Sequence, residues 1–133
     1  MTHVHVAVGV IHRNQKILLS RRHQDSHQGG LWEFPGGKVE QDEGVQVALD
    51  RELREELGIG VVSCEPLLEV RHDYGDKQVL LDVWWVSRYS GEETGLEGQP
   101  LLWADSRQLS ELAFPAANKP IVDAVILRLQ GTC

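Results

Sequence analysis

The apolar residues of this chain lie in short runs rich in branched side chains, separated by polar or glycine-containing turns, and this pattern predicts β-strands. The first run covers residues 4–11, and a turn at Asn14-Gln15 leads into a hairpin partner at residues 16–22. Residues 23–30 are polar with no apolar period, which indicates a surface loop. The remaining predicted strands cover residues 31–34, 61–70, 78–86 and 101–103.

Two segments instead show the spacing of an amphipathic helix. Between residues 44 and 57 apolar side chains recur three and four positions apart, and Gly58 suits the left-handed cap that ends a helix. A final helix is predicted to open at Asn118-Lys119-Pro120, and its apolar stripe includes Ile121, Ala124, Val125 and Leu127. No repeat or linker interrupts the chain, so we expect one α/β domain over residues 1–133, with a mixed sheet covered by two helices.

The predicted helix at residues 44–57 carries a cluster of acids beside its apolar face. On a helical wheel Glu52 and Glu56, one turn apart, lie at the edge of the leucine-rich face, and Glu55 lies beside them. Like charges at this spacing repel each other, and Arg51 can neutralise only part of the cluster. Mg²⁺ can neutralise it, because this ion binds one or two carboxylates together with water and phosphate oxygens. The alternative is a solvated acidic face without a ligand.

The segment before this helix contains two adjacent glycines. Pro35-Gly36-Gly37 is expected to end the strand at residues 31–34. The absence of side chains at Gly36 and Gly37 lets the backbone approach a ligand closely, and a free carbonyl here can join a metal shell. A double glycine that only makes a turn is the alternative.

The charge of the chain bears on its partners. The formal net charge is −7, from 13 Lys plus Arg and 20 Asp plus Glu, whereas proteins that follow a nucleic-acid backbone normally carry the opposite excess. The charge therefore argues against a nucleic-acid polymer, and a small phosphorylated molecule remains compatible if metal ions lie between the negative charges. No apolar run is long enough to span a bilayer and no signal-peptide pattern is present, so we expect a cytoplasmic protein with no membrane partner.

The acids and the double glycine belong to a known sequence motif. Its fixed positions are filled by Gly37, Glu43, Arg51, Glu52, Glu55, Glu56 and Gly58, so residues 37–59 resemble the loop–helix–loop signature of the Nudix hydrolases. The stretches at residues 7–11, 33–38, 97–100 and 114–120 resemble the MutT branch of that family, which removes 8-oxo-dGTP from the nucleotide pool. The resemblance runs through nearly the whole chain and is densest at residues 31–59 and 97–121.

The resemblance implies an α/β/α sandwich around a mixed β-sheet, and hydrolysis of a nucleoside triphosphate to the monophosphate and pyrophosphate. It implies Mg²⁺ as cofactor, with Mn²⁺ able to substitute. The metal ligands would be the Gly36 carbonyl, Glu52, Glu55, Glu56 and Glu97. Glu52 and Glu97, in that order, are the candidates for the base that accepts a proton from the attacking water. Glu43 and Arg51 would brace the loop–helix–loop.

Four residues are candidates for substrate binding, and three of them have a structural alternative. Asn118 can pair with a purine edge through its amide or can cap the final helix. Phe34 can contact the base or pack in the core. Arg22 can reach the base or a phosphate, or can lie exposed at a strand end. Lys38, next to the double glycine, is the fourth candidate.

The resulting prediction is a monomeric 8-oxo-dGTP diphosphatase whose partner is a small-molecule nucleoside triphosphate. A related pyrophosphohydrolase that prefers CTP or methylated dCTP is one alternative, and a non-catalytic nucleotide sensor is another. Residues 71–78 match no motif, and a position beside the pocket would leave the choice of base open. Asp82, a polar residue in an apolar strand, is predicted either to point into the pocket or to face solvent.

Overall fold

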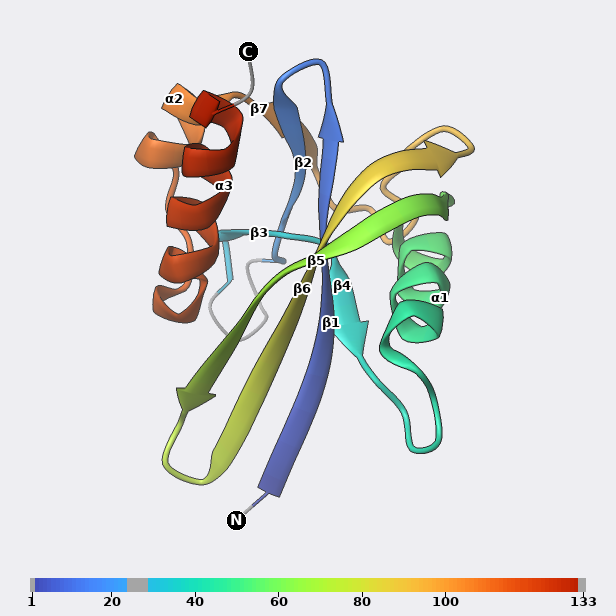
Figure 1. The fold of residues 1–133 in the computed structure, drawn as a ribbon, viewed down its shortest axis with the longest axis vertical. Coiled ribbons are helices and arrows are strands. Elements are labelled where there is room, and N and C mark those ends of the chain that lie inside the picture. Colours follow the sequence, from blue (N-terminus) through green and yellow to red (C-terminus); the bar gives the residue numbers. More distant parts are fainter. Residues whose placement is uncertain (1, 24–28, 132–133) are drawn as a thin grey trace.

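The computed structural model describes residues 2–23 and 29–131, and the elements below are those of the described residues (Figure 1). The strands are β1 (Thr2–Arg13), β2 (Lys16–Arg21), β3 (Trp32–Glu33), β4 (Gly36–Lys38), β5 (Gly60–Asp73), β6 (Lys77–Ser90) and β7 (Leu101–Ala104). The helices are α1 (Val45–Leu57), α2 (Ser106–Glu111) and α3 (Lys119–Gly131), and a 3-10 turn, η1 (Ala116–Asn118), precedes α3. Most of the surface loop predicted at residues 23–30, namely 24–28, lies outside the described residues.

The strands form one mixed sheet in the order β3-β2-β1-β6-β5. β1 and β6 run parallel, from Thr2 opposite Lys77 to Ile11 opposite Val86, and β5 pairs antiparallel with β6. The other edge of β1 is shared between two partners, because β4 pairs with Val6, Ala7 and Val8 in its middle and β2 pairs with its last residues. β7 extends the sheet beyond β2. The predicted mixed sheet is therefore confirmed.

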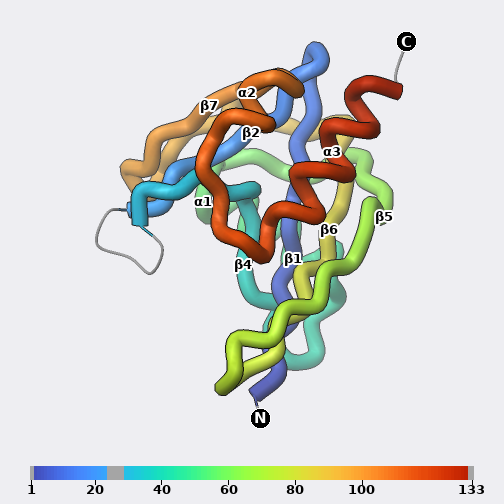
Figure 2. The backbone as a smooth tube through the Cα atoms, turned by 90° about the vertical axis from the view of Figure 1, so that its left-hand side faces the viewer, coloured from blue at the N-terminus to red at the C-terminus, as the bar shows by residue number. Residues whose placement is uncertain are grey.

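Helices cover both faces of the sheet, as Figures 1 and 2 show. α1 packs on one face, and its buried residues are Ala48, Leu49, Leu53 and Leu57. α2 and α3 lie together on the other face, where Leu109 and Ile121 join a separate core. Neighbouring residues of β1, such as Ala7 and Val8, point into different cores, because side chains alternate along a strand. The predicted α/β/α sandwich is confirmed.

The turns around β1 and α1 also follow the sequence. Asn14 and Gln15 have positive φ values of 52° and 65°, which suit the tight turn that joins β1 to β2. Gly58 has a φ of 72°, and its N–H donates to the Arg54 carbonyl to close the end of α1. Within the described residues no helix is both long enough and apolar enough to cross a membrane.

The double glycine follows the end of the strand predicted at residues 31–34, as expected, and it also begins a short strand that the sequence pattern did not predict. β3 ends before Pro35, but Gly36–Lys38 then forms β4 and pairs with β1. The φ of 154° at Gly36 is accessible only to glycine, and it redirects the chain between the two short strands. The glycines therefore belong to the sheet, where their backbone faces α1.

Two helical predictions are wrong. Two helices were expected, and α2 is an additional one, opened by a capping box between Asp105 and Gln108. Leu127 is 70% exposed and does not belong to the apolar stripe of α3. It lies two residues from buried Val125, which places it about 200° around the helix. Leu129 takes the position in the core instead.

Candidate active site

α1 carries the predicted acids along the border of its buried face. Glu52 keeps 17% of its side-chain surface exposed, Glu55 keeps 59%, and Glu56 is half-buried. Glu52 and Glu56 are directed toward β4, because the first lies against Gly37 and the second accepts a hydrogen bond from the N–H of Gly36. The amphipathic pattern of α1 thus places two acids between the core and β4.

The contact between α1 and β4 requires both glycines. A Cβ atom on Gly37 would collide with the carboxylate of Glu52, so only glycine leaves room for that acid. A Cβ atom on Gly36 would collide with the carbonyl of Ala7 in β1. The two glycines are therefore needed on opposite sides, one toward the acidic helix and one toward the neighbouring strand.

Arg51 is the cation at the centre of the acidic segment. Its Nε donates to Glu43 Oε2 at 2.8 Å and its Nη2 to Glu43 Oε1 at 2.9 Å. It also donates to Glu52 Oε1 at 2.9 Å and to the Lys38 carbonyl at 3.0 Å, and it lies 3.6 Å from Glu55. The hydrogen bonds from Arg51 lower the pKa of Glu43 to about 2. The contact expected between Glu43 and Arg51 is present, and it ties the preceding loop to α1.

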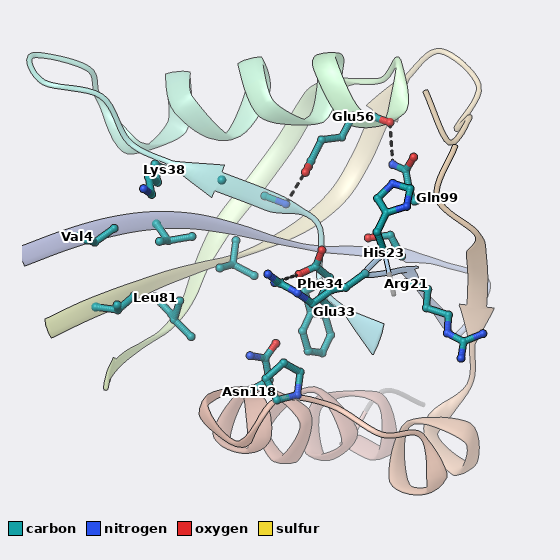
Figure 3. Close-up of a pocket in the computed structure, with 18 of the residues that line it drawn as sticks. Val4, Arg21, His23, Glu33, Phe34, Lys38, Glu56, Leu81, Gln99 and Asn118 are labelled. Atoms are coloured by element: carbon teal, nitrogen blue, oxygen red, sulfur yellow. Dashed lines mark hydrogen bonds and ion pairs between the residues drawn. The ribbon is translucent and has the colours of Figure 1, made fainter. Parts of the chain in front are cut away.

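Glu56 has no cation beside it among the described residues. Its Oε2 accepts the N–H of Gly36 at 3.2 Å (Figure 3). Burial, followed by the negative charges of Glu52 and Glu97, raises the pKa of Glu56 to about 8. A carboxyl group in this environment needs a counter-ion to be ionised at neutral pH.

Glu97 approaches the same region from the loop between β6 and β7. Burial is the main cause of the raised pKa of both Glu56 and Glu33, and the charge of Glu97 adds to it in each case. The Leu96 N–H and the Gln99 side-chain amide both donate to the Glu56 carbonyl at 3.1 Å. The loop that carries Glu97 is thus attached to the last turn of α1.

A cavity of about 530 Å³ lies between α1, the strands and the start of α3 (Figure 3). Its size falls within the range of about 300–1,000 Å³ that is usual for small-molecule sites. The parallel strands β1 and β6 supply its apolar wall, which consists of Val4, Val6, Val8, Val79 and Leu81. The predicted site residues that line it are Arg22, Phe34, Gly36, Lys38, Glu56, Glu97 and Asn118. Those that do not line it are Glu43, Arg51, Glu52 and Glu55.

Asn118 is half-buried at the end of η1 and projects from the start of α3 toward the cavity (Figure 3). Within the described part of the chain its side chain forms no hydrogen bond. The capping contact considered from the sequence is therefore not observed, because η1 runs directly into α3. The amide remains available to a ligand.

Two of the other three substrate-binding candidates already have a side-chain partner. Phe34 is 5% exposed and stacks on Phe114 with ring centroids 5.5 Å apart, so it packs in the core and also lines the cavity. Arg22 Nη1 donates to Glu33 Oε2 at 2.6 Å. Lys38 is exposed at the end of β4 and lines the cavity.

Several residues that line the cavity are not among the predicted site residues. Glu33 lines the cavity as the partner of Arg22, and burial raises its pKa. Tyr74 and Lys77 also line it, so the unmatched segment at residues 71–78 does border the cavity. A mixed polar turn at the end of two strands carries no signal of this position, because only the sheet brings it there.

Asp82 does neither of the two things predicted for it. It does not line the cavity, and its side chain is 14% exposed. Its carboxylate accepts from Trp84 Nε1 at 2.9 Å and is paired with His5 Nε2 at 2.9 Å. A cross-strand hydrogen-bond network thus explains this polar residue.

Two of the predicted metal ligands, Glu52 and Glu56, lie against Gly37 and Gly36, but the predicted ligands do not form a preformed cage. Among the described residues no group of three or more His, Cys, Asp or Glu side chains is arranged to hold a metal ion. Mutual repulsion of the carboxylates favours this spread arrangement. The donors nevertheless fit Mg²⁺, which needs only one or two direct carboxylates. The Glu56 carboxyl, which has no cation beside it in the described part of the chain, indicates the same need for positive charge.

The fold and the acidic helix beside a nucleotide-sized cavity define the Nudix class of hydrolases. The family model of the NUDIX domain matches residues 6–124. The chain therefore belongs to the Nudix hydrolase family, whose members act on nucleotide anhydrides and generally depend on a divalent metal ion.

Three relatives illustrate how similar the chain is to known members. It is 37% identical over 123 residues to an 8-oxo-dGTP diphosphatase of Escherichia coli K12, covering 92% of this chain and 95% of that one. It is also 37% identical over 124 residues to a CTP pyrophosphohydrolase of the same strain, covering 93% and 92% of the two chains. The solution structure of the E. coli ORF135 protein matches with a TM-score of 0.87 at 36% identity, covering 98% of this chain and 93% of that chain.

Proposed function

We propose that the protein hydrolyses 8-oxo-dGTP to 8-oxo-dGMP and pyrophosphate. The observation that carries this proposal is the position of Asn118, whose amide faces the cavity with no hydrogen-bond partner among the described residues. Val4, Val6 and Leu81 supply an apolar wall for the face of a planar base. An apolar slot with one polar reader suits recognition of a nucleobase.

The amide of Asn118 suits oxidised guanine for a chemical reason. Guanine presents two acceptors, N7 and O6, along one edge. Oxidation at C8 places a hydrogen on N7, so this edge then offers one donor and one acceptor. A side-chain amide also has one acceptor oxygen and one donor nitrogen. It can therefore form both hydrogen bonds with the oxidised base but only one with guanine.

The triphosphate would extend from the base toward the acids of α1. A divalent cation, when bound, supplies the positive charge that withdraws electrons from phosphorus and acidifies a coordinated water. Glu52, Glu55 and Glu56 would hold Mg²⁺ from the helix, with Mn²⁺ able to substitute. The Gly36 carbonyl and Glu97 would hold it from β4 and the later loop. Lys38, exposed beside the cavity, would attract the phosphates.

The proton would pass to one of the two carboxylates considered from the sequence, and we favour Glu97. Glu52 is already hydrogen-bonded to Arg51, whereas Glu97 is exposed and forms no ion pair within the described residues. The water oxygen would bond to the β-phosphorus as its proton moves to the carboxylate. The bond from that phosphorus to the oxygen bridging the α-phosphorus would break, which leaves the nucleoside monophosphate and pyrophosphate. Arg51 and Glu43 would keep the loop before α1 in place.

A CTP pyrophosphohydrolase is the second candidate, because a relative of that activity is as similar as the diphosphatase. The chemistry of Asn118 permits it, since cytosine also presents an amino donor beside a ring acceptor. Tyr74 and Lys77 border the cavity at the segment that matches no motif, and they would then contribute to the choice of base.

The test is pyrophosphate release from a panel of triphosphates with Mg²⁺, including 8-oxo-dGTP, dGTP, CTP and 5-methyl-dCTP. The proposal expects 8-oxo-dGTP to have the highest kcat/KM. An equal or higher value for CTP would replace it with the second candidate. Absence of turnover of every triphosphate, with tight nucleotide binding, would support a non-catalytic sensor. The proposal takes the protein as a monomer acting on the cytoplasmic nucleotide pool.

A further inference from the structure

We propose that Gln99 is a positioning residue that fastens the loop carrying Glu97 to the end of the acidic helix α1. Its side chain accepts one hydrogen bond and donates another, and Figure 3 shows the donated one, to the Glu56 carbonyl. Nε2 donates to the Glu56 carbonyl at 3.1 Å, and Oε1 accepts the backbone N–H of Glu97 at 2.9 Å. One half-buried amide thus connects the two segments on which the predicted acids lie.

The end of α1 needs such partners. The last carbonyls of an α-helix accept no hydrogen bond from within the helix, so their donors must come from elsewhere. Here the loop supplies them, because the Thr94 N–H donates to the Leu57 carbonyl at 2.9 Å and the Leu96 N–H to the Glu56 carbonyl at 3.1 Å. Gln99 adds a second donor to the Glu56 carbonyl. The loop therefore supplies donors to the last two carbonyls of the acidic helix, beyond the bond made by Gly58.

The attachment works against electrostatic repulsion. The charge of Glu97 adds to the effect of burial in raising the pKa of Glu56, so the two carboxyl groups lie close enough to repel each other. A neutral amide can hold the segments together without adding to the negative charge. Glutamate at position 99 would retain an acceptor for the Glu97 N–H, but it would face the Glu56 carbonyl with another acceptor.

Glu97 is held at its backbone while its carboxylate remains exposed. Gln99 binds its N–H, and His23 Nε2 lies 3.2 Å from its carbonyl oxygen. A fixed backbone with an exposed side chain suits a group that must act on a ligand in the cavity. A displacement of about 1 Å in such a group can cost about 10²-fold in rate. Gln99 should therefore affect kcat more than KM.

Gln99→Leu removes both hydrogen bonds at similar volume, and Gln99→Glu removes only the donor. Gln108→Leu is the matched control, because Gln108 Oε1 also accepts a backbone N–H, that of Asp105 at 3.0 Å, but in the capping box of α2 outside the cavity. One readout is kcat and KM with Mg²⁺, on whichever triphosphate the wild type hydrolyses fastest. The other readout is hydrogen exchange of the Thr94 amide, measured without metal or nucleotide. Gln99 does not contact this amide directly, because the Thr94 N–H donates to the Leu57 carbonyl.

Gln99→Leu is expected to lower kcat by roughly 10- to 100-fold, to leave KM within about threefold, and to speed exchange at Thr94 at least about tenfold. Gln99→Glu should also lower kcat and speed exchange at Thr94. Gln108→Leu should leave kcat and the Thr94 exchange rate near wild type. A wild-type kcat or a wild-type exchange rate at Thr94 in Gln99→Leu would overturn the proposal.

The kinetic readout rests on the proposed function, whereas the exchange readout does not. If the wild type hydrolyses no triphosphate, the proposed function fails, and exchange at Thr94 alone decides whether Gln99 fastens the loop. If CTP is the preferred substrate, the same comparison is made with CTP. The two proposals can therefore fail separately.

Discussion

The carboxylate of Glu52 occupies the space that a Cβ atom on Gly37 would fill. This relationship joins the acidic helix α1 to strand β4 at the position where a cation and phosphates are proposed to bind. Arg51 holds the same carboxylate from the other side through a hydrogen bond of 2.9 Å. The position of the Glu52 carboxylate thus depends on the lack of a side chain at Gly37 of β4 and on the hydrogen bond from Arg51 of α1.

Gly37→Ala is expected to displace the Glu52 carboxylate and to lower kcat by about 10²-fold or more, because small displacements of a reacting group are costly. The measurement is steady-state pyrophosphate release at saturating Mg²⁺. Gly44→Ala is the matched control, since nothing lies within 4 Å of a Cβ atom there and its φ is −71°. Equal kinetics in the two variants would show that the contact with Glu52 has no catalytic importance.

Glu52→Gln keeps the size of the side chain and removes its charge. We expect turnover to fall by about 10²- to 10⁴-fold, whichever of the two roles, ligand or base, Glu52 performs. Circular dichroism and thermal unfolding should remain close to wild type. Glu111→Gln, on the exposed side of α2, controls for the loss of one surface charge. Turnover that survives Glu52→Gln would remove this acid from the proposed site.

The stability of the metal-free protein should depend on Glu56. Burial and the neighbouring carboxylates raise its pKa to about 8, whereas its pKa in the unfolded chain is near the ordinary value of 4.5. Between these values the folded state holds a proton that the unfolded state has released. The free energy of unfolding should therefore fall as pH rises through this window, by at most about 1.4 kcal/mol per pH unit.

Glu56→Gln carries no such proton and should lack this part of the pH dependence. Urea unfolding in the presence of EDTA, from about pH 5 to about pH 8, measures the difference. The variant should gain stability relative to wild type as pH rises. Parallel profiles of the two proteins would contradict the raised pKa of Glu56.

Asn118→Ala should weaken discrimination between 8-oxo-dGTP and dGTP more than it slows turnover. A paired hydrogen-bonding contact to a base is worth about 1–3 kcal/mol of discrimination. The ratio of kcat/KM for the two nucleotides is the measurement, and Lys119→Ala at the exposed neighbouring position controls for disturbance of the start of α3. A uniform loss of activity with an unchanged ratio would instead indicate a structural role at this helix start.

The acidic helix could be predicted in detail because its signals are local. The spacing of Leu49, Leu53 and Leu57 defines the buried face, and the positions of Glu52 and Glu56 relative to that face follow from helix geometry. Gly58 marks the end of the helix for an equally local reason, since glycine adopts the left-handed conformation without strain. The missed helix α2 had a local signal too, in the capping box of Asp105 and Gln108.

Other features depended on contacts between distant segments. Asp82 is explained by His5, which a strand register brings beside it from 77 residues away. Glu33 was not singled out, although Arg22, its partner in the structure, was. A double glycine usually marks a turn, but Gly36 pairs with β1. Its positive φ depends on the position of β1, which local sequence does not reveal.

The chain's own pattern was therefore sufficient for the mixed sheet, the acidic helix and the family to which the protein belongs, since periodicity and motif spacing act over a few turns or strands. The cavity wall was not accessible in that way. Tyr74 and Lys77 reach the cavity through the pairing of β5 and β6, and Val4, Val6 and Leu81 line it through the parallel pairing of β1 and β6. Such positions depend on long-range packing, because it makes neighbours of residues that lie far apart in the sequence.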